Sequence, residues 1–207
     1  MRAFVLVGHT QPLDPEFSLD DLPGSAGRLD VLCRNLTAAL LLSHDIRRDV
    51  SVWLVLRDEI TIEVRGDAVR HLRPDERSTA ALIRSALETA ADRVVSPRPV
   101  ESTPGVYVRR QGLEATLDAL VASYTLIRLD PDGPQLTPAD TPSSPAFVLS
   151  DHQPLTADEV ALLDECGAER WSLGPATVHG DQAIAVAHNM ADRADGCESS
   201  DSGTPAA

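Results

Sequence analysis

Residues 170–184 read Arg-Trp-Ser-Leu-Gly-Pro-Ala-Thr-Val-His-Gly-Asp-Gln-Ala-Ile, and residues 146–152 read Ala-Phe-Val-Leu-Ser-Asp-His. In both stretches a short apolar run typical of a strand leads into small and polar residues, and a helical pattern follows. This order is typical of an α/β sheet, in which ligands bind where the strands end. The two stretches therefore predict a ligand site built from two loops at one edge of a sheet.

The length and composition of the chain indicate one packed domain. The chain has 207 residues, of which 43% are hydrophobic and 3% aromatic, so the core must consist mainly of Leu, Val, Ile and Ala. We expect the domain to span residues 1–192. Residues 193–207 are polar and acidic, with Gly and Ser, and are expected to form a disordered tail.

The charged residues exclude several functions. The formal net charge is −14, and every basic residue is Arg, so lysine-dependent phosphate loops, Schiff bases and Ser–Lys hydrolases are excluded. An acidic chain without Lys suits a halophilic cytoplasm, although a GC-rich genome that encodes Arg in place of Lys would give the same composition. No apolar run approaches a membrane span and the apolar N-terminus is too short for a signal peptide, so we expect a cytoplasmic protein.

The hydrophobic pattern predicts strands and helices in alternation along the chain. Strands are predicted at residues 4–8, 50–56, 59–65, 106–108, 125–129 and 146–149 and near 171. Helices are predicted at residues 28–43, from 74, at 113–121, at 156–166 with a capping box, and at 181–192. The proline-bearing segments 10–27, 94–104 and 130–145 are predicted to be loops.

Two other kinds of site find only weak support in the sequence. Ser150, Asp151 and His152 could belong to a hydrolase, but G-x-S-x-G is absent, and an Asp directly after a strand is more commonly a turn residue or a helix cap. A metal site is not expected, because His179 and His188 are nine residues apart and point to different faces of one helix. The three cysteines show no C-x-x-C spacing and predict neither zinc nor a disulfide framework.

Clusters of Arg stand out in this acidic chain and are candidates for RNA contacts. Arg binds phosphate through two parallel hydrogen bonds and stacks on bases. For any single Arg, an ion pair with the abundant Asp and Glu explains its presence equally well. The candidates are Arg34, Arg70, Arg73, Arg77, Arg109 and Arg110.

Several ordered blocks resemble one known family. The blocks are Asp21–Arg34, Leu42–Val50, Pro74–Arg77, Thr103–Arg110 and the two C-terminal stretches quoted above. Together they resemble the archaeal tRNA (pseudouridine(54)-N(1))-methyltransferases, the TrmY family of the SPOUT superfamily. The resemblance implies a SPOUT-type α/β sheet with helices on both faces and a C-terminal trefoil knot. It also implies a homodimer formed through the knot region.

The resemblance further implies a reaction and its residues. S-adenosylmethionine would be held in the knot, and its methyl group would pass to N1 of a pseudouridine in the T-loop of tRNA. Asp30 would position or accept the N1 proton, with Arg28 beside it, although a purely structural pair at a helix start explains both residues equally well. The implied cofactor contacts are Leu129, Leu149, Ser150, Leu173, Gly174, Val178 and Ala183.

The chain departs from the family pattern at the start of its last helix. The family usually has His-Ala-Asp-His-Cys-Ile where residues 179–184 stand here, so Gln182 and Ala183 replace a His and a Cys. Two alternative functions stay open. One is the same reaction on ribosomal RNA, and the other is a catalytically silent protein that binds RNA or the cofactor with the same fold.

Overall fold

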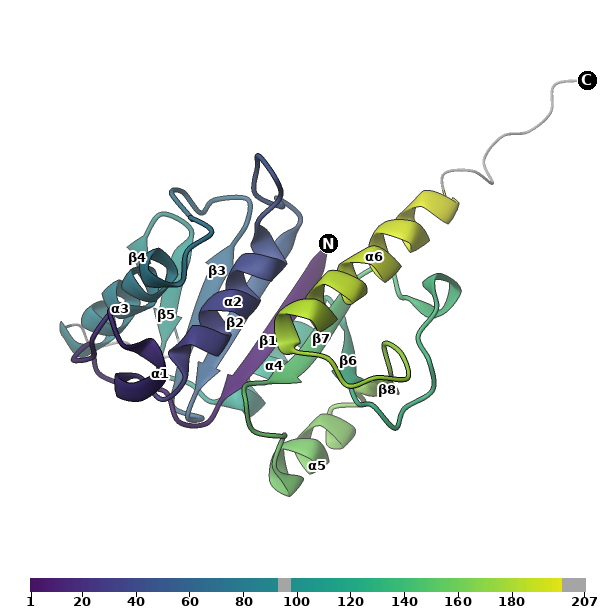
Figure 1. Ribbon diagram of the computed structural model, residues 1–207. Helices are drawn as coiled ribbons and strands as arrows, with labels where there is room; N and C mark the ends of the chain where they lie inside the picture. Colours follow the sequence, from purple (N-terminus) through teal and green to yellow (C-terminus); the bar gives the residue numbers. More distant parts are fainter. Residues whose placement is uncertain (93–97, 199–207) are drawn as a thin grey trace, which may run out of the picture.

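The fold is built on one eight-stranded sheet, which the computed structural model describes together with its helices over residues 1–92 and 98–198 (Figure 1). The strand order is β4-β5-β3-β2-β1-β7-β6-β8. The central strand β1 pairs in parallel with β2 and β7, and β6 pairs in parallel with β7 and β8, whereas β3, β5 and β4 pair antiparallel. The strands are β1 (Arg2–Gly8), β2 (Val50–Leu56), β3 (Ile60–Arg65), β4 (Val100–Thr103), β5 (Val106–Arg109), β6 (Thr125–Leu129), β7 (Pro145–Ser150) and β8 (Glu169–Trp171).

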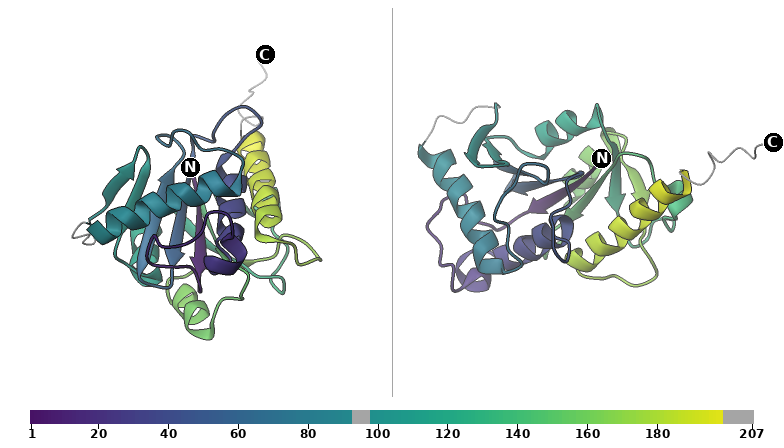
Figure 2. Two further views of the ribbon diagram at one scale, coloured as in Figure 1. Left: turned by 60° about the vertical axis from the view of Figure 1, so that its left-hand side comes forward. Right: turned by 90° about the horizontal axis from the view of Figure 1, so that it is seen from above.

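Helices cover both faces of this sheet, as predicted. Alternate residues of β1 point to opposite faces, so Phe4 and Leu6 enter one apolar core and Val5 enters another. The first core is closed by α2, α3 and α6, and the second by α4 and α5 (Figure 2). The helices are α1 (Leu22–Ser25), α2 (Leu29–Leu40), α3 (Glu76–Asp92), α4 (Leu113–Val121), α5 (Ala157–Glu165) and α6 (Gly180–Glu198), with a 3₁₀ turn η1 (Pro138–Asp140).

The sequence-based prediction was wrong in four segments. The predicted loops 10–27 and 130–145 contain the short helix α1 and the 3₁₀ turn η1. Within the predicted loop 94–104, Val100–Thr103 forms β4, which pairs with β5 alone at the edge of the sheet. An edge strand needs one ladder only, so prolines just outside it are tolerated. The last helix runs to Glu198 and does not end near Asp192, so residues 193–198 are helical where a disordered tail was predicted. The predicted loop residues 94–97 and the rest of the tail, 199–207, lie outside the described residues.

A buried histidine joins α6 to α2 and to the first strand. His188 is 3% exposed, and its Nε2 lies 2.9 Å from the Ala39 carbonyl oxygen, to which it donates. Nδ1 is then the acceptor that faces Arg2 Nη1 at 3.3 Å. Arg2 also donates to Asp192 on the next turn of α6. Burial lowers the pKa of His188 to about 4; the positive charges of Arg47 and Arg2 add to this effect, and the bond to Ala39 opposes it.

This arrangement predicts acid sensitivity. Above about pH 6.5 His188 is neutral in both the folded and unfolded chain; below that pH the unfolded chain takes up a proton that the folded protein resists until about pH 4. The free energy of unfolding should therefore fall as the pH drops through this window, by up to roughly 3 kcal/mol. Denaturant titrations between pH 8 and 4 should show a shallower decline for His188→Gln, with His44→Gln, at an exposed histidine, as the control. Equal declines in the wild type and His188→Gln would contradict this assignment.

Candidate functional site

A cavity of about 440 Å³ lies at the edge of the sheet where β6 and β7 end. Its walls are these two strand ends, the loop between β8 and α6, and the first two turns of α6. The structure brings all seven predicted cofactor contacts to this one cavity, although β6 and α6 are far apart in sequence. The seven are Leu129, Leu149, Ser150, Leu173, Gly174, Val178 and Ala183.

Backbone hydrogen bonds hold the cavity walls together. Asp130 N–H donates to the Trp171 carbonyl at 2.9 Å, and Leu136 N–H donates to the Ser172 carbonyl at 2.8 Å. The loop after β6 is therefore hydrogen-bonded to the end of β8, where the loop between β8 and α6 begins. The buried Ser172 hydroxyl then donates to the Gly174 carbonyl at 2.9 Å, which curls the loop that follows β8. Most of the lining is apolar or backbone, which suits a ligand of nucleoside size.

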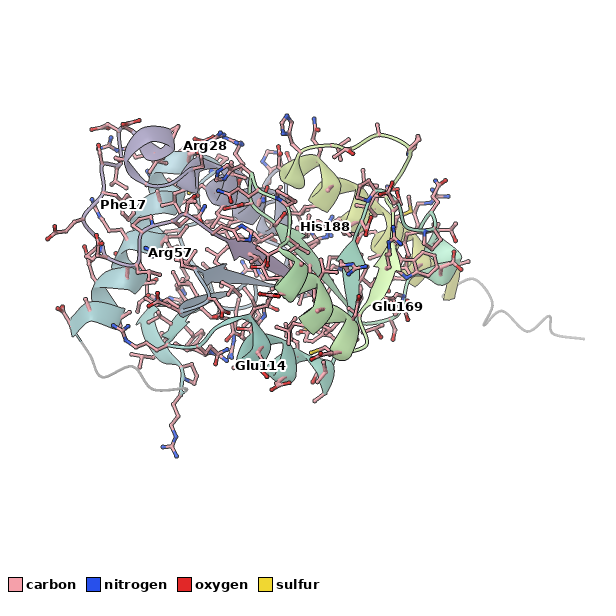
Figure 3. The ribbon with its side chains drawn as sticks, turned by 90° about the horizontal axis from the view of Figure 1, so that it is seen from below. Phe17, Arg28, Arg57, Glu114, Glu169 and His188 are labelled. Atoms are coloured by element: carbon pink, nitrogen blue, oxygen red, sulfur yellow. The ribbon has the colours of Figure 1, made fainter. Side chains whose placement is uncertain are left out.

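Arg28 and Asp30 form a two-pronged ion pair at the start of α2. Arg28 Nε and Nη2 lie 3.0 and 3.2 Å from the two carboxylate oxygens of Asp30. Arg34, one turn further along, donates to the same carboxylate at 3.0 Å and to Glu76 at 3.0 Å. Arg28 lies at the end of the loop that leads into α2, and is labelled in the view from below (Figure 3). The structure therefore places Asp30 between two guanidinium groups.

The surroundings of Asp30 keep its carboxylate ionised. Asp30 is 3% exposed, and burial alone would raise its pKa, but the hydrogen bonds from Arg28 and Arg34 outweigh burial and hold the pKa below its ordinary value. A carboxylate with a lowered pKa is a weak proton acceptor. In this arrangement Asp30 is better suited to orienting the two guanidinium groups than to removing a proton.

Asp151 forms a buried network with His9 that reasoning from the sequence did not predict. The Asp151 side chain has no exposed surface and accepts hydrogen bonds from His9 N–H and Gln153 N–H at 3.0 and 2.8 Å. His9 Nδ1 lies 3.0 Å from Asp151, and Nε2 lies 3.0 Å from Glu159. Burial would lower the pKa of His9, but these two carboxylates outweigh it and raise that pKa. His9 thus joins the cavity-lining Asp151 to the capping box of α5.

The candidate RNA-binding arginines do not form one continuous group. Arg73 and Arg77 are exposed near the start of α3, and Arg77 pairs with Asp20. Arg70 is exposed and lines a separate hollow with Arg48. Arg110 is exposed and donates to the Ala90 carbonyl at 3.2 Å.

Arg109 is not on the surface. It is 8% exposed, pairs with Glu63, and lies with its guanidinium carbon 4.6 Å from the centre of the Trp53 ring. The structure therefore does not bring Arg109 to a position where it could contact RNA. Its burial follows from its position on β5, next to a carboxylate of β3, a pairing that the sequence alone does not show.

Metal binding and membrane insertion find no support in the part of the chain that the structure describes. There, no three His, Cys, Asp or Glu side chains gather in a way that could hold a metal ion. Among the same residues, no helix combines the length and apolar character that crossing a bilayer requires.

Comparison with known proteins gives the class first. Residues 1–195 match the sequence model of a family described as "Putative SAM-dependent RNA methyltransferase". A solved structure of Archaeoglobus fulgidus Nep1, whose title describes it as bound to S-adenosylhomocysteine, has the same fold: the TM-score is 0.66 at 15% identity, over 94% of this chain and 99% of Nep1. The trefoil knot stays a prediction.

Relatives of higher sequence identity show which family within this class the chain belongs to. The chain is 52% identical to the tRNA (pseudouridine(54)-N(1))-methyltransferase of Haloarcula marismortui, over 94% of this chain and 98% of that protein. It is 50% identical to the protein of the same name from Haloferax volcanii, with the same coverage. The chain belongs to the family of tRNA (pseudouridine(54)-N(1))-methyltransferases.

Proposed function

We propose that this protein transfers a methyl group from S-adenosylmethionine to N1 of pseudouridine 54 in the T-loop of tRNA, as the names of its relatives describe for them. The observation that carries the proposal is the cavity at the ends of β6 and β7. It gathers in one place the seven residues that the family resemblance assigns to the cofactor. The Arg28–Asp30 pair supplies a charged group at the start of the neighbouring helix α2.

The cavity fits the cofactor in size and in chemistry. Its volume of about 440 Å³ lies within the usual range for small-molecule sites. Gly174 and Ala183 leave room for close approach to backbone, and Leu129 and Leu149 offer apolar surface to a purine ring. When bound, S-adenosylmethionine supplies an electrophilic methyl group on its sulfonium. Binding in the cavity would hold this group in one orientation while the substrate nitrogen is aligned with it.

The Arg28–Asp30 pair is proposed to orient the RNA. Methylation at N1 forms a nitrogen–carbon bond, breaks the sulfonium–carbon bond and releases the N1 proton. Because the Asp30 carboxylate has a lowered pKa, we assign it the orientation of Arg28, and the proton leaves to solvent. The Arg28 guanidinium can then donate to a phosphate or to a uracil carbonyl of the flipped-out base.

Methyl transfer from labelled S-adenosylmethionine tests this proposal directly. Two T-loop RNAs that differ only in having pseudouridine or uridine at the target position should be compared in high salt. Label on the pseudouridine RNA alone is the expected result. Label on neither RNA, from a folded protein that binds the cofactor, would favour a ribosomal RNA substrate or a silent binding protein.

Arg34, Arg73 and Arg77 are proposed to form the RNA-binding face beside Arg28. Replacing Arg73 and Arg77 together by Ala is expected to weaken RNA binding about tenfold at moderate salt, since each phosphate contact adds to affinity through counterion release. The double variant Arg84→Ala with Arg193→Ala removes the same charge elsewhere and is the control. Filter binding should show the loss for the first pair only, and calorimetry should show unchanged cofactor affinity for both. Equal RNA affinity in the two double variants would contradict the assignment of Arg73 and Arg77 to the RNA-binding face.

A homodimer formed through the C-terminal helix region and a cytoplasmic location are part of the proposal. The dimer is what the family resemblance implies, and identity of 50–52% to two members over nearly their full length supports membership of that family. Light scattering of the purified protein in high salt should give about twice the mass of one chain. A monomeric mass over the whole concentration range of the methyl-transfer assay would contradict the dimer.

A further inference from the structure

The Gln11 side chain lies between the cofactor cavity and the turn that carries Arg28. Gln11 is fully buried. Its Nε2 donates to the Gly27 carbonyl at 2.9 Å and to Asp151 Oδ2 at 3.0 Å, and its Oε1 accepts from Thr10 N–H at 3.2 Å. Because a carbonyl and an ionised carboxylate can only accept, the orientation of the Gln11 amide is determined by its partners. One NH₂ group therefore joins two elements of the site.

On the cavity side, Gln11 Nε2 donates to Asp151, whose carboxylate is held by several other hydrogen bonds. Asp151 lines the cavity directly after Ser150, and its side chain is completely buried. Besides Gln11 it accepts from His9 N–H, from Gln153 N–H and from the His9 ring. Loss of the Gln11 bond leaves these three bonds in place, so the cavity wall should keep its shape.

On the other side, the bond ends at a strained turn. Gly27 and Arg28 both adopt left-handed conformations, with φ of 55° and 62°. For Arg28 this conformation is costly and must be held by its surroundings. The Gly27 carbonyl receives two side-chain donors, Gln11 Nε2 and Thr10 Oγ1, the latter at 2.8 Å. Of these two, only Gln11 also contacts the cavity wall.

We propose that Gln11 is a positioning residue that couples the cofactor cavity to the Arg28–Asp30 pair. Binding in the cavity steadies Asp151, and the Gln11 amide transmits this order to the Gly27–Arg28 turn that presents Arg28 to the RNA. The inference rests on the proposed function for the identity of the substrate. The coupling itself is a property of this chain and can be measured without RNA.

Hydrogen exchange tests the coupling in the absence of RNA. Adding S-adenosylhomocysteine to the wild-type protein should slow amide exchange in residues 172–186, which contribute to the cavity, and also in residues 26–34. In Gln11→Met, which keeps the length of the side chain and removes its donors, protection of 172–186 should persist and protection of 26–34 should be lost. Protection of 26–34 in both proteins, or in neither, overturns the proposal.

Kinetics test the consequence for the reaction. Gln11→Met and Gln11→Glu should lower kcat/KM for pseudouridine RNA about tenfold or more, within the range of coupled sites. Cofactor affinity should change by less than about threefold, because Asp151 keeps its other partners. Gln111→Glu, which makes the same change outside the cavity, is the control and should retain wild-type kinetics. An equal loss of cofactor and RNA binding in the Gln11 variants would mean that Gln11 only supports the fold, and would overturn the proposal.

A pH profile distinguishes the effect of the hydrogen-bond donor at position 11 from the effect of side-chain shape. In Gln11→Glu the introduced carboxyl group faces Asp151 and the Gly27 carbonyl, so its protonated form can donate one of the two lost hydrogen bonds. The activity of Gln11→Glu relative to Gln11→Met should therefore rise as the pH falls from 8 to 6, because the nearby Asp151 carboxylate favours protonation of the introduced group. Gln11→Met contains the same His9, Asp151, His152 and Glu159 and is the reference. A constant ratio overturns the role of the donor. If the wild-type protein itself fails to methylate the RNA, the proposed function fails, and hydrogen exchange still decides the coupling.

Discussion

Asp30→Asn is expected to lower kcat/KM for pseudouridine RNA about a hundredfold while cofactor affinity stays within twofold of the wild type. The substitution keeps the size of the side chain and removes the charge that holds Arg28 and Arg34. Hydrogen bonds to charged groups contribute roughly 1.5–3 kcal/mol each, and a loss of about 2.7 kcal/mol in the transition state corresponds to a hundredfold. Steady-state methyl transfer and calorimetry with S-adenosylhomocysteine measure the two quantities.

The control for Asp30 is a second Asp–Arg pair. Asp45 is exposed and pairs with Arg48 at 3.3 Å, so Asp45→Asn removes the same charge without affecting Arg28. Asp45→Asn should keep wild-type kinetics. If Asp30→Asn also keeps wild-type kinetics and loses only stability, the Arg28–Asp30 pair has the purely structural role that the sequence left open.

Ala183→Leu is expected to weaken cofactor binding by more than about a hundredfold. Ala183 lies on the first turns of α6, lines the cavity and packs against the core, so the larger side chain has to occupy space that the ligand needs. A well-packed core cannot move aside to make room, and overpacking costs typically about 1–3 kcal/mol in addition. Calorimetric titration with S-adenosylmethionine measures the loss, and thermal unfolding shows whether the fold is kept.

Two further substitutions on α6 make this prediction specific. Ala183→Cys restores the residue of the family pattern and should bind the cofactor within threefold of the wild type. Ala185→Leu adds the same side chain at an exposed position of the same helix and should leave cofactor binding unchanged. Unimpaired cofactor binding by Ala183→Leu would mean that the ligand does not use this cavity.

The sequence was sufficient for those parts of the fold that depend on local pattern. The apolar runs of β1, β2 and β7 and the capping box at Thr156 all lie where the pattern predicts them. The prediction for residues 100–103 was wrong because β4 is a short edge strand that is stabilised by its pairing with β5. Its own residues Glu101 and Ser102 are not strongly strand-forming. The predicted end of α6 was wrong because Asp192 and Asp195 pair with Arg2, which is distant in sequence and could not be identified as their partner.

The candidate site was also predictable from the sequence only in part. The seven predicted cofactor contacts were chosen from two stretches that match a family pattern, and all of them line one cavity. Their contact with the cofactor stays a prediction. Gln11 could not be found, because its role depends on three partners distant in sequence or bound through the backbone. Arg109 was assigned to the RNA face because a sequence does not show which Arg is buried against a carboxylate.

The strand order has a consequence for synthesis of the protein. The strands from residues 50–109 all lie on one side of β1, and those from residues 125–171 all lie on the other. A nascent chain that has emerged only as far as β5 already contains β1 and every strand on one side of it, so β2, β3, β4 and β5 have all their partners, and β1 lacks only β7. The cofactor cavity has no wall at all until β6 emerges and is closed only by residues up to Val186. A ribosome that stops early therefore releases a half-sheet that has the Arg28–Asp30 pair but no place for the methyl donor.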